Sequence, residues 1–264
     1  LGKKRIFITA GPLIKFSKKN LAKWLIRNPQ SFGSIRDAAY EFVSHIVSRY
    51  AQVVRSWRVI ENLNSINCFG FSFEQVMEIT RTMNMAVKAV GARNVRIVEV
   101  GNPWGEYYAT TPNTIPPLIY IDMLIQSGIN FDAFGVQFHL GKNHQGMHVR
   151  DFMHIASILD CFAATAKPLY ITEVEVPSQA DGDQFAPEKA GIWHEKWNQT
   201  RQSRWIEEFY KIAFSRQFVD SVTYANLKDD DNAIIFNSGL LDSSSHPKKS
   251  LNSIKNLKKK IFSK

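Results

Sequence analysis

Short apolar runs alternate strictly with longer amphipathic stretches along this chain. Each apolar run has the length of a strand, and each stretch between two runs repeats its apolar residues at the spacing of a helix. Strands that alternate with helices in this way are parallel and are joined by crossover helices. The sequence therefore predicts an α/β fold with six strand–helix units. We expect the strands at residues 6–9, 55–60, 95–100, 131–138, 169–176 and 220–227.

Capping residues mark the ends of several predicted helices. Ser72 and Gln75 are spaced as a capping box before one helix. Pro116 and Pro117 suit the start of the next helix, and Gly128 suits its end. In the first long helix, we expect a single face to be buried. That face consists of Ile35, Ala38, Phe42, Ile46, Tyr50 and Val53.

Two folds are built from such units, a doubly wound sheet and a (β/α)8 barrel. No Gly-x-Gly-x-x-Gly follows a predicted strand, which argues against dinucleotide binding by a doubly wound sheet. Polar side chains instead cluster at the C-terminal ends of several strands, as they do in the active site of a barrel. We therefore predict a single TIM barrel domain over residues 1–264 that contains six of the eight units. The polar residues are Glu61, Asn62, Gln137, His139, Glu173 and Glu175.

Composition narrows the classes of function. No apolar run approaches the roughly 20 residues that cross a bilayer. The net charge of +9 is concentrated at the C-terminus, where seven lysines and no acidic residue follow Pro247. We expect a terminal helix with a docked apolar face and a solvated basic face, rather than a nucleic-acid site. Cys68 and Cys161 belong to no Cys-x-x-Cys motif, and we expect two buried free thiols.

The predicted strand at 169–176 contains two carboxylates, Glu173 and Glu175. Side chains alternate along a strand, so both carboxylates lie on the face opposite Thr172. A carboxylate on the inner face of a strand is costly unless it is paired or functional. Taken alone, this pattern fits a salt bridge to a cation of the barrel as well as it fits catalysis.

Four segments resemble glycoside hydrolase family 10, the endo-β-1,4-xylanase family. Residues 171–176 (Ile-Thr-Glu-Val-Glu-Val) resemble the strand of the family's nucleophile, and residues 134–140 resemble the strand before it. Residues 57–62 resemble the strand of the acid/base, and residues 239–248 resemble the closing segment. The order and spacing of the four segments agree with the family. The resemblance begins at the family's third strand, so we expect the first two strands to be missing from this chain.

The resemblance implies a retaining mechanism, in which two carboxyl groups about 5–5.5 Å apart flank the glycosidic bond. Glu173 stands at the position of the nucleophile. His139 would hydrogen-bond Glu173 and orient it, and Gln137 would contact the substrate. Tyr224 in the last strand is a further candidate for substrate contact.

The chain departs from the family pattern at three places around the sugar that is attacked. The family has Asn and then Glu at the end of the acid/base strand, whereas this chain has Glu61 and then Asn62. An amide cannot donate a proton to a leaving oxygen or recover one from water. Ile8 and Thr9 replace a Trp-His pair, and Ala225 replaces a Trp. We therefore expect the xylose-binding subsite to be altered or lost.

The loop after the strand at 95–100 offers aromatic residues and a further carboxylate. Trp104, Tyr107 and Tyr108 could stack on the apolar faces of sugars, and Glu106 could be a relocated acid. The same residues could instead pack on the rim of the barrel.

Three histidines, His139, His144 and His148, lie close together in the sequence. Two of them have the i, i+4 spacing that places zinc ligands on one face of a helix, and Glu173 could join them. Residues 141–146 have the composition of a loop, and no His-Glu-x-x-His pattern is present. We therefore expect exposed histidines and no metal.

These observations lead to one preferred function and two alternatives. The preferred function is a retaining glycoside hydrolase that cleaves β-1,4-linked, xylan-like polysaccharide, with Glu173 as nucleophile and Glu61 or Glu106 as acid/base. The first alternative is a catalytically inactive barrel that binds carbohydrate, which Asn62 favours. The second is a metal-dependent hydrolase. We expect a polysaccharide or oligosaccharide partner, no cofactor, no nucleic acid, no membrane, and a monomer. The family resemblance implies secretion.

Overall fold

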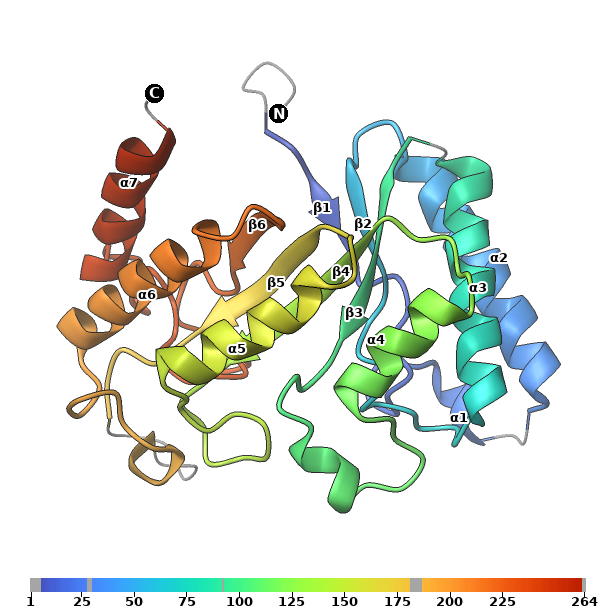
Figure 1. The fold of residues 1–264 in the computed structure, drawn as a ribbon, viewed down its shortest axis with the longest axis horizontal. Coiled ribbons are helices and arrows are strands. Elements are labelled where there is room, and N and C mark those ends of the chain that lie inside the picture. Colours follow the sequence, from blue (N-terminus) through green and yellow to red (C-terminus); the bar gives the residue numbers. More distant parts are fainter. Residues whose placement is uncertain (1–5, 28–29, 92, 181–186, 263–264) are drawn as a thin grey trace. The chain divides into compact units, whose positions relative to one another are not determined.

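The computed structural model describes residues 6–27, 30–91, 93–180 and 187–262, along which parallel strands alternate with helices (Figure 1). The strands are β1 (Thr9–Ala10), β2 (Ser56–Ile60), β3 (Val95–Val100), β4 (Ala133–His139), β5 (Leu169–Glu175) and β6 (Val219–Tyr224). They follow one another in the sheet in the order of the chain. This is the strand–helix arrangement of a TIM barrel, and it confirms the predicted fold class.

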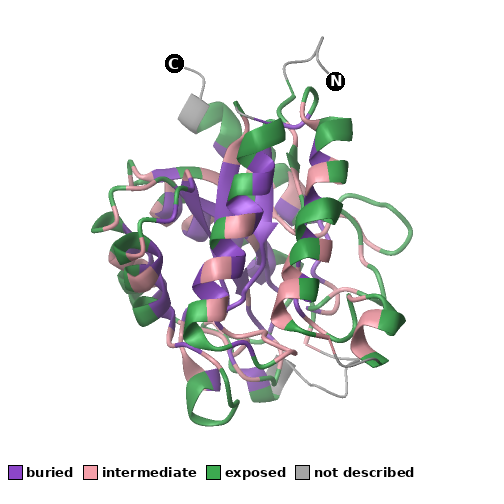
Figure 2. Cartoon of the chain, turned by 90° about the vertical axis from the view of Figure 1, so that its right-hand side faces the viewer, coloured by how far each residue is buried: buried purple, intermediate pink, exposed green. Residues whose placement is uncertain are grey.

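Helices connect the strands. They are α1 (Lys23–Arg27), α2 (Phe32–Tyr50), α3 (Phe73–Val90), α4 (Pro117–Gln126), α5 (Phe152–Ala163), α6 (Gln199–Phe214) and α7 (Lys249–Phe262). α4 lies within the limits that Pro116 and Gly128 predict. The short 3-10 helices η2 (Glu106–Ala109) and η3 (Pro187–Ala190) lie in loops. Figure 2 shows that buried residues gather on the strands and on the adjoining faces of the helices, while the outer helix faces are exposed.

The chain forms two compact units, residues 1–136 and 137–264. β4 belongs to the first unit up to Val136 and to the second from Gln137 onward. Each unit has its own apolar core. The core of the first unit includes Val43, Val59, Ile79 and Val98, and that of the second includes Ile155, Ile171, Trp205 and Phe209.

The first strand begins later than predicted. Residues 6–8 are not in a strand, and the side chains of Ile6 and Phe7 are exposed. β1 consists only of Thr9 and Ala10, which pair in parallel with Ser56 and Trp57 of β2. β1 begins at Thr9 because Thr9 is the partner of Ser56, the first residue of β2.

The buried face of α2 differs from the predicted face by one residue. Its buried residues are Ile35, Ala39, Val43 and Val47, whereas Phe42 and Tyr50 are exposed. Both stripes have a helical period, and the one with the smaller side chains is buried where α2 packs on α3. At the start of α3, Ser72 and Gln75 form both hydrogen bonds of the predicted capping box.

The second unit contains the basic C-terminal helix. α7 packs against α6, with Leu257 buried and Leu251 and Ile254 half-buried, as predicted for its apolar face. The side chain of Ile261, the last predicted member of that face, lies outside the described residues. Cys161 of this unit and Cys68 of the first unit are free thiols, but both are partly exposed rather than buried.

Candidate active site

A histidine of β4 lies between two carboxylates of β5 in the second unit. Nδ1 of His139 is 2.7 Å from Oε1 of Glu175, and Nε2 is 3.3 Å from Oε2 of Glu173. Glu173 and Glu175 therefore share one face of β5, as strand alternation requires. The side chain of Glu173 is 24% exposed and that of Glu175 only 1%. Of the two carboxylates, Glu173 is the one that solvent or a substrate can reach.

Glu175 is held in place by two residues that follow β6. Its Oε2 accepts hydrogen bonds from Nδ2 of Asn226 and from Oγ of Ser238, the latter at 2.7 Å. Nδ2 of Asn226 also donates to Oγ of Ser238 at 2.9 Å. With His139 on its other oxygen, Glu175 has partners on both oxygens. The buried carboxylate is thus a fixed acceptor for the imidazole.

The two carboxylates change the protonation of His139. Burial of the imidazole lowers its pKa, but the hydrogen bonds and negative charges of Glu173 and Glu175 outweigh burial and raise the pKa of His139 to about 9. The ring is therefore charged at neutral pH. It contributes a positive charge next to Glu173, and its hydrogen bond to Glu175 fixes its orientation.

Tyr224, a predicted substrate contact, is engaged by the protein itself. Its hydroxyl donates to the carbonyl oxygen of Ser238 at 2.7 Å and lies 3.3 Å from Nε2 of Gln202. Nε2 of Gln202 also donates to the carbonyl oxygens of Val176 and Ser238. Burial raises the pKa of the Tyr224 phenol. These contacts tie the end of β5, the end of β6 and the first turn of α6 together, so the Tyr224 hydroxyl holds Ser238 in place for Glu175.

The other predicted residue of β4, Gln137, has a side chain that is 8% exposed. It lies two residues before His139 and therefore on the same face of the strand. The structure thus brings Gln137, His139, Glu173 and Glu175 to the C-terminal ends of two strands of one unit. Sequence reasoning missed Asn226 and Ser238. Asn226 follows the end of a strand, which is a usable signal, whereas nothing in the sequence around Ser238 distinguishes it.

In the first unit, two cations pair with both oxygens of Glu61. Nζ of Lys15 donates to Oε1, and Nη2 of Arg58 donates to Oε2 at 3.1 Å. Nε of Arg58 donates in turn to Oε1 of Glu99 at 2.9 Å. Glu61 is only 5% exposed, and Glu99 is fully buried. The cluster pairs buried charges of opposite sign. Both oxygens of Glu61 are therefore already bound to cations, and these are the atoms that would have to contact a substrate.

Asn62 packs tightly against the loop after β3. Its backbone is left-handed, with φ 53°, a conformation that asparagine tolerates better than most residues. A Cβ atom at Gly101 would lie 2.5 Å from Cβ of Asn62, so the close approach requires glycine at 101. The Asn62 side chain is 7% exposed. An amide in a tight fit therefore stands where the family pattern has the acid/base.

The aromatic loop after β3 divides into buried and accessible residues. Tyr107 is 3% exposed, and its hydroxyl accepts from Nδ2 of Asn64 and donates to the carbonyl oxygen of Ile115, both at 2.6 Å. Burial raises the pKa of this phenol. Its position supports the loop and does not favour the predicted contact with sugar. Tyr108 is exposed, and Trp104 and Glu106 are partly exposed.

His144 and His148 lie in a loop, so the helical spacing that would align them does not apply. Nδ1 of His144 lies 3.1 Å from the carbonyl oxygen of Gln145, and Nε2 of His148 lies 3.3 Å from Oδ1 of Asn143. Within the described residues, no group of three or more His, Cys, Asp or Glu side chains is arranged to hold a metal ion. In the same residues, no helix is both long and apolar enough to span a membrane.

Comparison with known proteins identifies relatives of this fold. The model of glycosyl hydrolase family 10 matches residues 16–257. Solved structures with a similar fold include xylanase 10B from Thermotoga petrophila RKU-1 in complex with xylobiose and native xylanase 10B from Thermotoga maritima. Each is 16% identical with a TM-score of 0.71; the alignments cover 98% and 100% of this chain and 76% and 78% of those chains.

A third similar structure is native xylanase 10C from Cellvibrio japonicus, with 15% identity and a TM-score of 0.72. That alignment covers 97% of this chain and 57% of the other. A search of curated protein sequences gave no match. At this level of identity, the solved structures establish a shared fold, and function has to be argued from the site.

Proposed function

Because the chain belongs to glycosyl hydrolase family 10, as its sequence motifs predict, we propose that it hydrolyses xylan-like, β-1,4-linked polysaccharide with retention of anomeric configuration. The observation that carries this proposal is the Glu173–His139–Glu175 arrangement. It combines a reachable carboxylate with a charged, oriented imidazole at the C-terminal ends of neighbouring strands. Active sites of TIM barrels lie at this end of the sheet.

In the proposed reaction, Glu173 is the nucleophile. An oxygen of its carboxylate forms a bond to the anomeric carbon while the bond from that carbon to the leaving oxygen breaks. Water then displaces the carboxylate and releases the sugar. The positive charge of His139 stabilises the carboxylate and directs it, because Nδ1 of the ring is held by the fixed acceptor Glu175.

Proton transfer to the leaving oxygen needs a second group. Glu61 is a poor candidate, since both of its oxygens pair with cations and its side chain is 5% exposed. Glu106 lies in η2 and is partly exposed, so of the two carboxyl groups it is the better placed to meet a substrate. Glu106 is therefore the remaining candidate for the acid/base, away from the family position that Asn62 occupies, and partly exposed Trp104 is a candidate sugar contact.

Asn62 favours a second candidate function, carbohydrate binding without hydrolysis. An amide at the acid/base position removes the proton donor, and general acid–base help is worth about 10²–10⁴-fold in rate. In this alternative, the carboxylates and aromatic residues bind a polysaccharide chain that is not cleaved. For either function we propose one barrel domain that acts as a monomer and, as the family resemblance implies, outside the cell.

A proton NMR time course on purified protein with xylo-oligosaccharides tests the proposed function. Retention predicts that the β-anomer of the product appears first and then equilibrates with the α-anomer. Initial appearance of the α-anomer would contradict the nucleophile assigned to Glu173. Absence of products, together with saturable binding of xylan in calorimetry, would establish the binding function instead.

A further inference from the structure

The segment 237–239, between β6 and α7, carries a hydroxyl that contacts a carboxylate of the candidate site. Oγ of Ser238 donates to Oε2 of Glu175 at 2.7 Å, and Ser238 is completely buried, so it cannot meet a substrate. The preceding residue, Asn237, has a left-handed backbone with φ 53°. A residue other than glycine keeps this conformation where the surrounding structure holds it, and such residues cluster at functional sites. The contacts of the segment therefore indicate what its conformation is for.

Lys248 and Asp229 hold the backbone on both sides of Ser238. Nζ of Lys248 lies 2.7 Å from Asp229 and donates to the carbonyl oxygen of Asn237 at 3.1 Å. Oδ1 of Asp229 accepts from the N–H of Gly239 at 2.8 Å. A Cβ atom at Gly239 would lie 2.3 Å from the backbone nitrogen of Asp229, so this close approach requires glycine. One ion pair thus fixes the residue before Ser238 and the residue after it.

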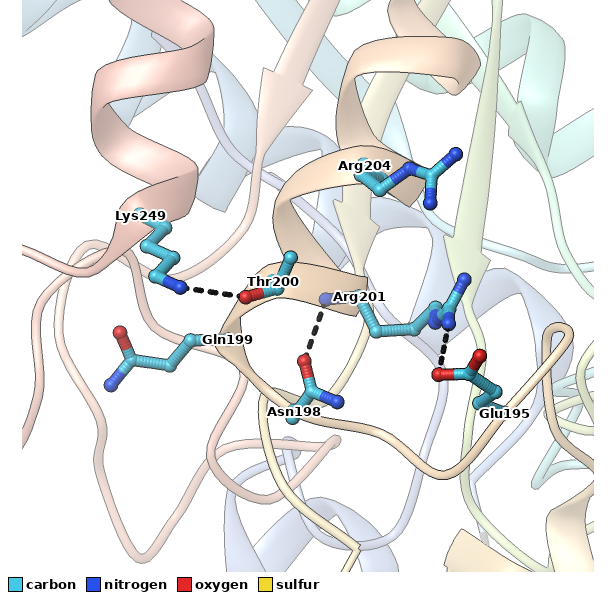
Figure 3. A pocket seen from close by; sticks show the side chains of 7 residues that line it. All are labelled: Glu195, Asn198, Gln199, Thr200, Arg201, Arg204 and Lys249. Atoms are coloured by element: carbon cyan, nitrogen blue, oxygen red, sulfur yellow. Dashed lines mark hydrogen bonds and ion pairs between the residues drawn. The ribbon is translucent and has the colours of Figure 1, made fainter.

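The carbonyl oxygen of Ser238 is held by the first turn of α6. Nε2 of Gln202 donates to this carbonyl oxygen at 3.1 Å. Two residues before Gln202, Oγ1 of Thr200 accepts from Nζ of Lys249, the first residue of α7, at 2.7 Å (Figure 3). The turn of α6 that holds Ser238 is therefore tied to the start of α7, directly after Lys248. Backbone groups of all three residues in the segment are thus held by neighbouring elements.

The position of the Ser238 hydroxyl determines which way Glu175 faces. Oε2 of Glu175 accepts from Ser238 and Asn226. Its Oε1 is therefore directed at Nδ1 of His139, at 2.7 Å. Among the described residues, the titratable groups that contact the imidazole are Glu175 and, on the other ring nitrogen, Glu173. Without the hydroxyl, the carboxylate can turn away from the imidazole, which then loses its fixed acceptor.

We propose that Ser238 is a positioning residue for the hydrolysis, and that the Lys248–Asp229 ion pair keeps it in place. The inference rests on the proposed function and extends it to buried residues that touch no substrate. Ser238 acts through Glu175, which orients His139 beside the nucleophile. Loss of the hydroxyl should therefore slow the reaction without weakening the binding of substrate.

The kinetics of Ser238→Ala on a dinitrophenyl xyloside test the proposal. We expect kcat to fall about tenfold at an unchanged KM, within the roughly 10²-fold that a misplacement of about 1 Å can cost. Lys248→Met should show the same split at a temperature where circular dichroism finds it folded. Ser253→Ala is the matched control and should keep wild-type kinetics. It removes a hydrogen bond of 2.7 Å between the hydroxyls of Ser203 on α6 and Ser253 on α7.

An NMR titration of the His139 ring measures the same effect without hydrolysis. If Glu175 turns away in Ser238→Ala, the pKa of His139 should fall by about one unit, because a hydrogen bond to the charged imidazole is lost. Ser253→Ala should leave this pKa unchanged. In a Glu175→Gln background, Ser238→Ala should have little further effect on kcat or on the pKa of His139, because the carboxylate that the hydroxyl orients is absent.

Two results would overturn the positioning role. One is a Ser238→Ala variant in which both kcat and the pKa of His139 equal those of wild type. The other is an effect of Ser238→Ala that persists in full in the Glu175→Gln background. Failure of the proposed function gives a different result, because wild type would then hydrolyse no substrate. A lower pKa of His139 in Ser238→Ala would in that case support the contact with Glu175 and separate it from catalysis.

Discussion

Nδ1 of His139 lies 2.7 Å from Oε1 of Glu175, a carboxylate that is almost completely buried. The contact fixes one side of the imidazole, so its other nitrogen faces Glu173 at 3.3 Å. Asn226 and Ser238 fix Glu175 in turn. A chain of contacts from β6 to β5 to β4 therefore determines the orientation and charge of the group next to the proposed nucleophile.

Glu173→Gln should abolish hydrolysis and leave the fold intact. Glutamine keeps the size of the side chain but cannot attack the anomeric carbon as a carboxylate, and loss of a nucleophile costs more than about a thousandfold in turnover. The measurement is turnover of an aryl xyloside, with circular dichroism to check folding. Glu208→Gln, a neutralisation on the outer surface of α6, is the matched control. If the Glu173→Gln variant has the same turnover as wild type, Glu173 is not the nucleophile.

His139 should make the stability of the protein depend on alkaline pH. Its folded pKa, about 9, lies above the ordinary value of 6.5, so folding binds a proton. The stabilisation is fully present below pH 6.5 and is lost as the pH rises through 9. We expect the free energy of unfolding from urea denaturation to fall over this window in wild type and to change less in His139→Asn. The exposed His45→Asn should follow wild type. Identical pH profiles for wild type and His139→Asn would show that the imidazole is not held as a cation.

The buried amine of Lys248 should be a strong determinant of stability. Nζ lies 2.7 Å from Asp229 and donates to Oγ of Ser178 and to the carbonyl oxygen of Asn237, and the side chain is 3% exposed. Lys248→Met leaves the Asp229 charge without its partner, and removal of one member of a buried pair costs about 3–5 kcal/mol. Urea denaturation measures this loss. Lys258→Met, at an exposed position of α7, should change stability by less than about 0.5 kcal/mol.

The sequence predicted the features that depend on local pattern. The alternation of strands and helices, the capping box of Ser72 and Gln75, and the shared face of Glu173 and Glu175 each depend on residues a few positions apart. The buried face of α2 was mispredicted, because the helix has two apolar stripes of the same period that differ by one residue. Only packing against α3 decides between the larger and the smaller side chains.

The contacts that define the site lie beyond local pattern. Ser238 reaches Glu175 from 63 positions along the chain, and Lys15 reaches Glu61 from 46. Pairings of this kind form only when the loops fold over the strand ends. They therefore cannot be predicted from the spacing of residues in the sequence. The burial of Tyr107 is a similar case, because it follows from hydrogen bonds to Asn64 and Ile115.

Asn62 should make proton transfer the weak step of catalysis. When a polysaccharide is cleaved, the departing sugar chain is a poor leaving group that needs a proton. Dinitrophenolate, in contrast, departs as a stable anion without one. We therefore expect wild type to cleave a dinitrophenyl xyloside readily and xylan slowly. The glycosyl-enzyme should accumulate because the amide of Asn62 cannot activate water from the acid/base position, and azide, which needs no base, should accelerate its breakdown.

Variants at position 62 separate the missing proton donor from a change of shape. Asn62→Glu supplies a carboxyl group and should raise turnover of xylan by about 10²-fold or more and remove the effect of azide, whereas Asn62→Gln has the same length without a proton and should do neither. Both variants keep the Lys15–Glu61–Arg58 cluster, and both extend the side chain next to Gly101, so strain affects them alike. The assay compares the three proteins on both substrates, with and without azide. Rapid, azide-insensitive cleavage of xylan by wild type would mean that another carboxyl group, with Glu106 the first candidate, already transfers the proton.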